Sequence, residues 1–333
     1  MRVHASVFAQ ESQDWKSGLS KLELLNIFHV HLDVTDDNLL LAKDVLSHLE
    51  QDGRFTVEIH AVLSHPSDLW SILGDCPVSC IYFQAEDLSA DPFANLPSAY
   101  EGVKKGLAYR WTSLEQLPPA KIESLDALLV MTTIPGQSGG SFPNEAFQVI
   151  GRWRRALTNT SLLIDGGIRP EVASVLKILG ISNVVVGAHL MRSDNPYQAY
   201  LDLLHPDMQV DVQAKYFMIE GKDVAQVSSD SSIWTALTEL DRGGLGILMV
   251  VDQGKCLGMA TNADLRRAVL EERDGKTNAP WWNANPLSVQ SETSFSQMIE
   301  LLNYHAMPLH LLPVIDEDRF CGLVHFNYLA HSL

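Results

Sequence analysis

Two histidines and two aspartates stand where the chain could hold a metal ion. His31 and Asp33 are two residues apart in an apolar run of β type, so both side chains point to one face of the expected strand. His60 and Asp165 follow in two later runs of the same type. Two imidazoles and two carboxylates form a mixed nitrogen and oxygen donor set, which suits Zn²⁺, Fe²⁺, Mn²⁺ or Co²⁺. The four residues therefore predict one divalent metal site, provided that the fold brings their strands together.

The first two-thirds of the chain has the pattern of a barrel. Short apolar runs alternate with segments of helical length, as expected for βα units around a parallel sheet. Eight such units within about 205 residues favour an α/β fold, a closed (β/α)8 TIM barrel, over an open doubly wound sheet. Functional groups of such barrels lie at the C-terminal ends of the strands, where these four residues occur. We expect strands at residues 3–9, 27–34, 55–63, 80–86, 106–110, 127–134, 161–165 and 183–187.

The remaining residues contain an internal repeat. Residues 246–265 match residues 310–329 at a constant offset of 64, with an apolar run that ends in Asp252 or Asp316 and a later glycine, Gly258 or Gly322. A duplication of this length predicts two packed modules, here a C-terminal α+β domain. We place the first domain at residues 1–208 and the second at 213–333, with modules at about 213–273 and 284–333. A polar linker at 274–285 joins them, and we expect its tryptophans, Trp281 and Trp282, to pack against a module.

Composition excludes several classes of protein. The 333 residues carry a formal charge of −17, and both expected domains are acidic. Affinity for nucleic acid depends largely on Lys and Arg that neutralise phosphates, so we expect no nucleic-acid partner. No apolar stretch reaches membrane-spanning or signal-peptide length, and no CxxC pair accompanies Cys76 and Cys80, which speaks against a zinc or disulfide framework. These features predict a reduced, cytoplasmic protein with no membrane partner.

Four motifs of the barrel resemble the ribulose-phosphate 3-epimerase family, from about residue 3 to about residue 204. His31-Leu-Asp33-Val-Thr-Asp36 resembles the family's H-x-D-x-M-D strand, and residues 57–66 resemble its D-x-H-L-M-x-x-x-P segment. Residues 131–142 are similar to M-x-V-x-P-G-x-x-G-Q-x-F, and residues 163–168 are similar to V-D-G-G-I. Because all four occur in order and in register, the resemblance implies the same fold and an isomerase that uses one divalent metal.

The resemblance also implies roles for the four residues. It implies that His31, Asp33, His60 and Asp165 ligate the metal and that the two aspartates form the acid/base pair. Inverting a carbon next to a ketone requires a proton to leave one face and another to arrive at the opposite face. A divalent cation lowers the energy of the enediolate intermediate. The competing interpretation is a polar layer inside the barrel, although hydrophobic side chains normally fill that space; we interpret His29 as such a core residue.

Glycine-rich loops provide candidates for binding a phosphate. Barrels of this type commonly hold phosphate with backbone N–H groups of the loops after the last strands. The resemblance places substrate and phosphate contacts at Met131, Gly139, Gly140, Gly166, Gly167, Gly187 and Ala188. The alternative is that each glycine only makes a tight turn between a strand and a helix.

The repeat region resembles a tandem pair of cystathionine-β-synthase-type (CBS) domains, over residues 215–333. Gly258-Met-Ala-Thr261-Asn-Ala-Asp264 is similar to the G-x-x-T-x-x-D motif of nucleotide-binding CBS modules. The resemblance implies that Thr261 and Asp264 contact the phosphate and ribose of an adenine or other nucleotide. The second copy has His325 and Tyr328 at these positions, so we expect at most one complete nucleotide site. A purely structural or dimerising tail is the alternative.

Several substrate-facing positions depart from the epimerase pattern. Thr35 and Val62 replace two methionines, Ala9 replaces a serine, and Gln84 replaces a histidine. Arg110-Trp111 stands at the usual Asn-Pro of the fifth strand, with one residue fewer. The metal ligands and phosphate loops are retained while the wall between them differs. This combination indicates retained proton chemistry on a sugar that need not be ribulose 5-phosphate, and Arg110 could meet an additional hydroxyl or anionic group.

The sequence therefore predicts a metal-dependent epimerase that inverts C3 of a phosphorylated ketose. Ribulose 5-phosphate, xylulose 5-phosphate or a related sugar phosphate would be the substrate, and a nucleotide at the CBS pair would tune activity or assembly of a homo-oligomer. The alternative is an inactive epimerase-like barrel that acts as a nucleotide-sensing or scaffold protein. A lyase of the related phosphate-binding barrels would need a D-x-K-x-x-D strand, and Asp33-Val-Thr-Asp-Asp-Asn38 lacks the lysine.

Overall fold

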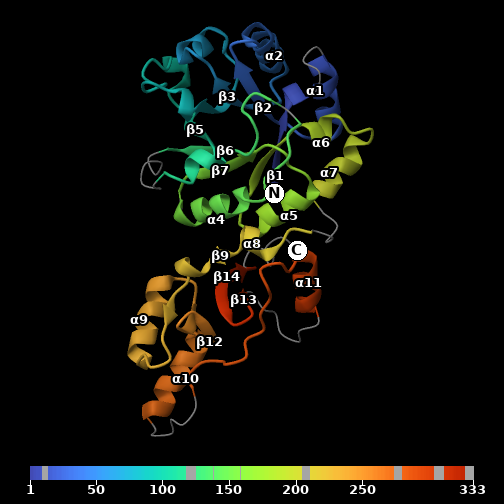
Figure 1. Cartoon of the computed structure of the whole chain (residues 1–333). Coiled ribbons are helices and arrows are strands. Elements are labelled where there is room, and N and C mark those ends of the chain that lie inside the picture. The colour runs from blue at the N-terminus through green and yellow to red at the C-terminus, as the bar shows by residue number, and fades with distance from the viewer. Residues whose placement is uncertain are drawn as a thin grey trace. The chain divides into compact units, whose positions relative to one another are not determined.

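A computed structural model describes residues 1–9, 14–117, 125–137, 139–157, 159–204, 211–273, 280–303 and 311–326. The chain divides into two compact units, Met1–Met208 and Gln209–Leu333 (Figure 1). The described helices include none with the length and apolar character needed to cross a bilayer. All four cysteines are free thiols.

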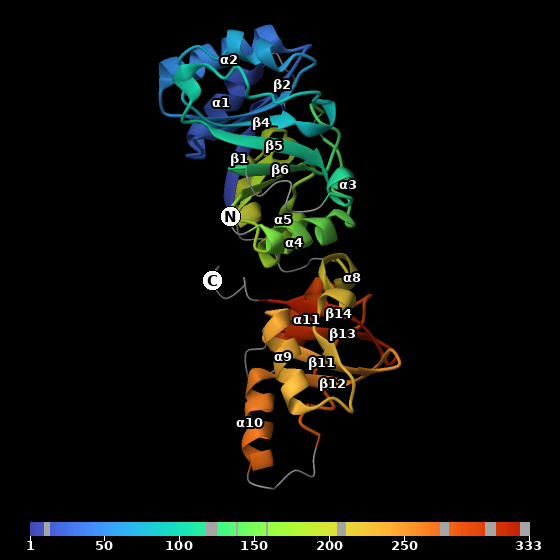
Figure 2. The ribbon, with the colours of Figure 1, turned by 90° about the vertical axis from the view of Figure 1, so that its left-hand side faces the viewer.

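The first unit is a closed barrel of eight parallel strands. Each strand pairs with the next one in the chain, and β8 pairs with β1 to close the sheet. Figure 2 shows β4, β5 and β6 as successive neighbours in the wall. The (β/α)8 fold is thereby confirmed. The strands are β1 (Arg2–Ser6), β2 (His29–Thr35), β3 (Thr56–Val62), β4 (Val78–Gln84), β5 (Lys104–Arg110), β6 (Ala127–Met131), β7 (Ser161–Asp165) and β8 (Asn183–Val186).

Helices cover the outside of the barrel unevenly. The longer ones are α1 (Trp15–Leu24), α2 (Leu39–Asp52), α4 (Ala146–Ala156), α5 (Pro170–Ile178) and α7 (Pro196–Leu204), and α6 (Ala188–Met191) is a single turn. We expected a segment of helical length after every strand. In the described residues, β3, β4 and β5 are followed only by 3₁₀ turns at Pro66–Ser71, Ala85–Asp87 and Ser98–Tyr100 and by the single turn α3 (Trp111–Leu114). Prolines at 66, 77, 92 and 97 explain the short turns after β3 and β4, because proline lacks an N–H donor and clashes with the preceding helical turn.

The barrel interior is apolar along β4 to β8 and carries polar side chains along β2. Tyr82, Leu129, Leu163 and Val185 belong to a buried cluster inside the barrel. Gly106 is required there, since a Cβ at this position would lie 2.5 Å from the Tyr82 ring. Along β2 the buried apolar residues alternate with residues 29, 31, 33 and 35. The apolar side chains of β2 therefore face the surrounding helices, and the side chains of residues 29, 31, 33 and 35 face the barrel interior.

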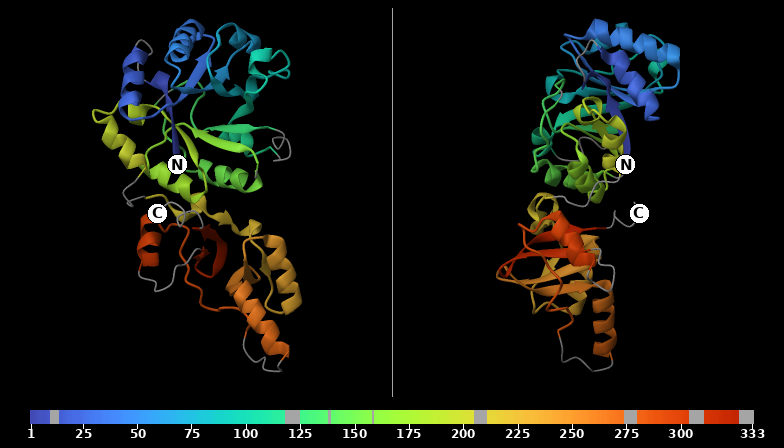
Figure 3. Two further views of the ribbon diagram at one scale, coloured as in Figure 1. Left: turned by 180° about the vertical axis from the view of Figure 1, so that it is seen from behind. Right: turned by 90° about the vertical axis from the view of Figure 1, so that its right-hand side faces the viewer.

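The second unit contains one mixed sheet. Its strand order is β10-β11-β12-β14-β13, with β9 paired to β14. The helices α9 and α10 lie side by side along this sheet (Figure 3). The elements are α8 (Ala214–Phe217), β9 (Ile219–Glu220), β10 (Gln226–Val227), α9 (Ile233–Gly243), β11 (Ile247–Asp252), β12 (Lys255–Thr261), α10 (Asn262–Arg273), α11 (Phe295–Asn303), β13 (Leu311–Asp316) and β14 (Arg319–His325).

The sequence repeat has a counterpart in backbone geometry. The hairpins β11–β12 and β13–β14 each contain a β-bulge, at Val250/Val251 and Val314/Ile315. Their turns each contain a residue with positive φ, Gln253 at 49° and Glu317 at 57°. All these pairs are 64 residues apart, so the duplication extends to the irregularities of the sheet. Trp281 and Trp282 pack against the core of the first module, as predicted, whereas linker residues 274–279 lie outside the described residues.

Candidate active site

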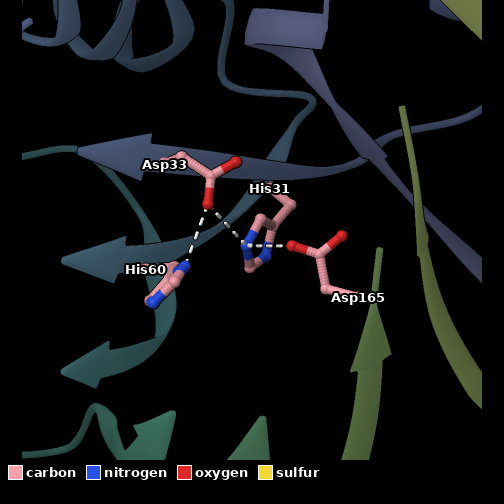
Figure 4. A group of neighbouring side chains, drawn as sticks. All are labelled: His31, Asp33, His60 and Asp165. Carbon is pink, nitrogen blue, oxygen red and sulfur yellow. Dashed lines mark hydrogen bonds and ion pairs between the residues drawn. The ribbon is translucent and has the colours of Figure 1, made fainter. Parts of the chain in front are cut away.

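The structure brings the two histidines and two aspartates together. His31 and Asp33 come from β2, His60 comes from β3, and Asp165 ends β7. Each of the four offers one donor atom, and these atoms all lie within 4.8 Å of one another. Figure 4 shows Asp33 and Asp165 reaching toward His31 from different strands. Residues that are far apart in sequence therefore form one compact donor set.

His31 is a buried imidazole without a hydrogen bond. Its side chain is 0% exposed, and neither ring nitrogen has a hydrogen-bond partner in the described part of the chain. The nearest carboxylate oxygens are Asp33 Oδ1 at 3.8 Å and Asp165 Oδ2 at 4.0 Å from Nε2. Leaving a buried polar atom unpaired costs roughly 1–3 kcal/mol. A cation between the imidazole and the two carboxylates would pair all three groups.

His60 is held in one orientation by a chain of hydrogen bonds. Its Nε2 lies 2.8 Å from Gln84 Oε1, and the Gln84 amide nitrogen donates to Glu86. Because a carboxylate can only accept, the Glu86 contact places the Gln84 oxygen toward His60. His60 Nε2–H therefore donates to Gln84, while Nδ1 faces Asp33 Oδ1 at 2.9 Å.

This arrangement supports a cation at the donor set. Two acceptors at 2.9 Å, the His60 Nδ1 lone pair and Asp33 Oδ1, repel each other unless a proton or a metal ion lies between them. Together with the His31 nitrogens, which have no hydrogen-bond partner in the described residues, this contact is compatible with a divalent metal, which the four residues could hold. Nitrogen and oxygen donors in these numbers match Zn²⁺, Fe²⁺, Mn²⁺ or Co²⁺.

The two aspartates differ in their readiness to hold a proton. Burial and the negative charge of Asp33 raise the pKa of Asp165 to about 6. Burial acts in the same direction on Asp33, but its interactions with His31 and His60 outweigh burial and lower its pKa. Burial opposes protonation of His31, yet Asp33 and Asp165 raise the pKa of its imidazole to about 9. One carboxylate is thus kept ionised and the other is biased toward the acid form, as in other acid/base pairs.

Two side chains that the sequence analysis missed fix the backbone beside the aspartates. Asn38 Nδ2 donates to the Asp33 carbonyl at 2.8 Å, and Asn38 Oδ1 accepts from Thr35 N at 2.9 Å. The Thr132 hydroxyl lies 2.8 Å from the Asp165 carbonyl and 2.7 Å from that of Gly166. Their positions near strand ends could have indicated this role, because Asn and Thr in turns commonly form hydrogen bonds with nearby backbone groups.

A cavity of about 440 Å³ opens beside the aspartates. Its lining includes Asp33 and Asp165 together with all the predicted substrate and phosphate positions: Met131, Gly139, Gly140, Gly166, Gly167, Gly187 and Ala188. Gly167 has a φ of +63°, and a Cβ there would lie 2.4 Å from the Phe142 amide nitrogen. This glycine is therefore needed for close loop packing, a role that is compatible with either interpretation of the glycine loops.

The wall of the cavity differs from the one expected. Arg110 is exposed and does not line the cavity; its backbone N–H donates to Glu86 Oε1 at 2.9 Å. Contact between Arg110 and a substrate therefore stays a prediction, and it does not involve the wall of this cavity. Arg169, His189 and Arg192 line the cavity instead, and the sequence analysis had not selected them.

Thr261 and Asp264 in the second unit bond mainly to each other. Thr261 N and Oγ1 donate to Asp264 Oδ2 at 2.9 and 2.6 Å, and Asp264 N lies 3.4 Å from Thr261 Oγ1. This is a capping box at the start of α10. A cavity of about 530 Å³ near β12 and β13 is lined by other residues, including Met259, Asn283 and Leu311. His325 ends β14, while Tyr328 lies outside the described residues.

Comparisons with known proteins agree with this division. The model of the "Ribulose-phosphate 3 epimerase family" matches residues 2–191, and the CBS domain model matches residues 217–271 and 283–333. The cytoplasmic isoform of ribulose-phosphate 3-epimerase from Oryza sativa subsp. japonica is 22% identical over 204 residues, covering 59% of this chain and 89% of that protein. The ribulose-phosphate 3-epimerase of Schizosaccharomyces pombe is 24% identical over 200 residues, covering 56% and 86%.

Solved structures that are similar to part of the chain include CBS-domain proteins. A CBS domain-containing protein of unknown function from Bacillus anthracis str. Ames Ancestor is 20% identical, with a TM-score of 0.32. The match covers 37% of this chain and 92% of that chain.

Proposed function

The chain belongs to the ribulose-phosphate 3-epimerase family over residues 2–191 and carries a tandem CBS pair after them, and from this premise we propose that its barrel is a metal-dependent 3-epimerase of a phosphorylated ketose. One observation carries the proposal: the donor atoms of His31, Asp33, His60 and Asp165 converge beside a cavity that glycine loops line on another side. A ketose anchored at the glycine loops would present its C2–C3 region to the aspartates.

Asp33 and Asp165 would move the protons. Asp33, whose pKa is lowered, acts as the base that removes the C3 proton from one face of the sugar. Asp165, whose pKa is raised to about 6, holds the proton that is returned to the opposite face. In the reverse direction the two aspartates exchange roles. The separation of their pKa values supports this assignment, because a carboxylate pair with equal pKa values would supply neither a dedicated base nor a dedicated acid.

The remaining residues would bind and orient. His31, Asp33, His60 and Asp165 would hold the metal, which supplies positive charge next to the two oxygens of the enediolate. Gln84 keeps the His60 ring in the orientation that directs Nδ1 toward Asp33. Met131, which is 2% exposed, offers an apolar contact beside the carbon skeleton.

For the tail, the proposal is one nucleotide site at the first module. The first module has the Thr261 and Asp264 pair, whereas the second has His325 at the position of Thr261. A bound nucleotide would have to compete with the hydrogen bonds that join Thr261 to Asp264. Calorimetric titration of the full chain with AMP, ADP and ATP tests this, and Asp264→Ala should abolish the heat of binding.

Hydrogen exchange in D₂O tests the epimerase directly. The metal-loaded protein is incubated with ketose phosphates of five to seven carbons, and deuterium entry at C3 is followed by NMR. We expect exchange for one member of the panel and none for the same sugar with Asp33→Asn or Asp165→Asn. Metal analysis of the same sample gives the cation. Bound metal without exchange for any sugar would contradict the epimerase and favour an inactive, scaffold-like barrel.

A further inference from the structure

Glu86 lies outside the donor set but is connected to it through side-chain hydrogen bonds. Its Oε2 accepts from the Gln84 amide nitrogen, and Gln84 Oε1 lies 2.8 Å from His60 Nε2. His60 and Gln84 are buried, whereas Glu86 is exposed in the 3₁₀ turn that follows β4. Glu86 is thus the outer end of a chain of polar groups that reaches one of the proposed metal ligands.

The Glu86 carboxylate is held in place by the backbone of a neighbouring strand. Its Oε1 accepts from the Arg110 backbone N–H at 2.9 Å, and Arg110 ends β5, which pairs with β4. Both carboxylate oxygens therefore have a donor, one from β5 and one from Gln84. Because an ionised carboxylate has no hydrogen to donate, Glu86 can receive only the N–H end of the Gln84 amide.

The orientation of the Gln84 amide decides which nitrogen of His60 carries the proton. With its oxygen toward His60, Gln84 accepts from Nε2–H, and the Nδ1 lone pair faces Asp33 Oδ1 at 2.9 Å. With its nitrogen toward His60, Gln84 would donate to Nε2, and the neutral ring would carry its proton on Nδ1. That proton would form a hydrogen bond with Asp33 and would occupy the lone pair that a metal ion needs. The two amide orientations therefore correspond to a ring that can bind a metal through Nδ1 and a ring that cannot.

We propose that Glu86 is a positioning residue that keeps His60 ready to bind a metal ion through Nδ1. The reversed amide would bring the Gln84 oxygen against a Glu86 oxygen, and two acceptors without a hydrogen between them repel each other strongly near a buried site. Without the carboxylate, the reversed amide becomes the favoured form of the metal-free site, because it gains the hydrogen bond from Nδ1 to Asp33. The inference rests on the proposed metal site, and outer partners of ligating histidines commonly fix their tautomer in this way.

Glu86→Gln tests this role with almost no change of shape. An amide at position 86 can accept from the Arg110 N–H with its oxygen and donate to Gln84 with its nitrogen, so the whole chain of amides can reverse. In the metal-free full chain, we expect His60 Nε2 to carry a proton in the original protein and to lose it in Glu86→Gln. Nitrogen-15 NMR of the histidine-labelled chain distinguishes these states, and His60→Asn identifies the signal.

Zn²⁺ affinity, measured by competition with a chelator, gives a second and independent result. We expect Glu86→Gln to lower the affinity about 10-fold to 100-fold, the range for loss of an outer partner of a metal ligand. Asp87→Asn is the matched control, because it removes one negative charge from the same turn, and it should leave the affinity unchanged. In a Gln84→Met background, Glu86→Gln should have no further effect, since Glu86 acts through Gln84. Near-ultraviolet circular dichroism checks that each variant is folded.

The outcomes separate this inference from the proposed function. A proton that stays on His60 Nε2 in Glu86→Gln would overturn the role of Glu86. An equal loss of affinity in Asp87→Asn, or the same loss in the Gln84→Met background, would also overturn it, because a general effect of charge would then explain the loss.

Deuterium exchange at C3 decides the epimerase independently of Glu86. A lost Nε2 proton and a selective loss of Zn²⁺ affinity in Glu86→Gln, without exchange for any ketose phosphate, would uphold the role of Glu86 and refute the epimerase. Exchange in the original protein, together with an unchanged Nε2 signal and unchanged affinity in Glu86→Gln, would support the epimerase and refute the role of Glu86.

Discussion

The motif residues of the two units differ in how far their polar groups are hydrogen-bonded within the protein. In the described part of the barrel, the His31 ring nitrogens have no hydrogen-bond partner, and burial together with the charge of Asp33 raises the pKa of the half-buried Asp165. In the CBS pair, Thr261 and Asp264 satisfy each other at the start of α10. A ligand would complete the first set, whereas it would have to replace existing bonds in the second. Unsatisfied polar groups therefore point to a ligand more strongly than does a matching motif alone.

The largest expected effect is on proton transfer. Asp33→Asn and Asp165→Asn should each lower the rate of C3 deuterium exchange about 10²-fold to 10⁴-fold, the range that general acid and base catalysis contributes. Asp264→Asn, the matched substitution in the tail, should leave the rate unchanged without added nucleotide. If both barrel variants exchange deuterium as fast as the original protein, the aspartates are not the acid/base pair. The barrel and tail substitutions would then have the same effect on the rate.

Metal binding should stabilise one unit and not the other. At a free concentration of 100 times Kd, a bound ion adds about 2.7 kcal/mol to the free energy of unfolding. Hydrogen exchange measured by mass spectrometry should therefore slow in β2, β3 and β7 when Zn²⁺, Mn²⁺ or Co²⁺ is added, and it should stay constant in β11 to β14. His31→Ala should remove the effect. Equal slowing of both units would mean that the ion binds elsewhere as well.

Without metal, ionisation of Asp165 should lower the free energy of unfolding as the pH rises. The pKa of Asp165 is raised to about 6 in the folded protein, so the folded state binds this proton more tightly than the unfolded state does. The free energy of unfolding therefore falls as the pH rises from about 4 through 6. Asp165→Asn should stabilise the metal-free protein by about 1–3 kcal/mol at pH 8 and by little at pH 4.

Urea unfolding at both pH values measures this difference. The variant that destroys activity would then be the more stable protein. If Asp165→Asn is instead less stable than the original protein at pH 8, the Asp165 carboxylate stabilises the fold through the imidazoles. The polar groups of the barrel site would then be as well paired as those of Thr261 and Asp264.

The smallest effect concerns the tail. Thr261→Ala removes the cap of α10 and should cost about 1 kcal/mol locally, whereas Thr261→Ser should retain most of it. Hydrogen exchange in residues 262–273 should speed up about fivefold, with no change in the barrel strands. If added nucleotide restores the protection in the Ser variant alone, the pair both caps the helix and contacts a ligand. If exchange is unchanged in both variants, the capping role is wrong.

The sequence predicted the strands of the barrel better than the connections between them. The eight apolar runs are short and β-rich, and the four donor residues fall at their ends, so the topology of the barrel determines which of them meet. The segments after β3 and β4 have helical length, but their prolines disfavour helices, and an expectation based on segment length alone did not take this into account. The repeat offset of 64 predicted the matching hairpins of the tail, including residues that the structure places in their bulges.

The contacts between side chains of different elements could not be predicted from the sequence. Gln84 was recognised as a departure from the family histidine, but its bond to His60 depends on the pairing of β3 with β4, and its bond to Glu86 depends on the 3₁₀ turn that follows β4. Arg192 and His189 carried no motif, and their proximity to the Gly139 loop depends on the pairing of distant parts of the chain. Such contacts follow from tertiary structure and not from local spacing.

The position of the proposed metal ligands on the strands implies an order of events during synthesis of the chain. Three ligands lie on β2 and β3, which are adjacent in both sequence and sheet, whereas the fourth ends β7. Contacts between distant segments form late because closing long loops costs entropy. A growing chain thus carries an incomplete donor set until β7 pairs with its neighbours, and full affinity for the proposed ion would develop only when the barrel closes. Metal uptake would accordingly report the end of folding and not direct its beginning.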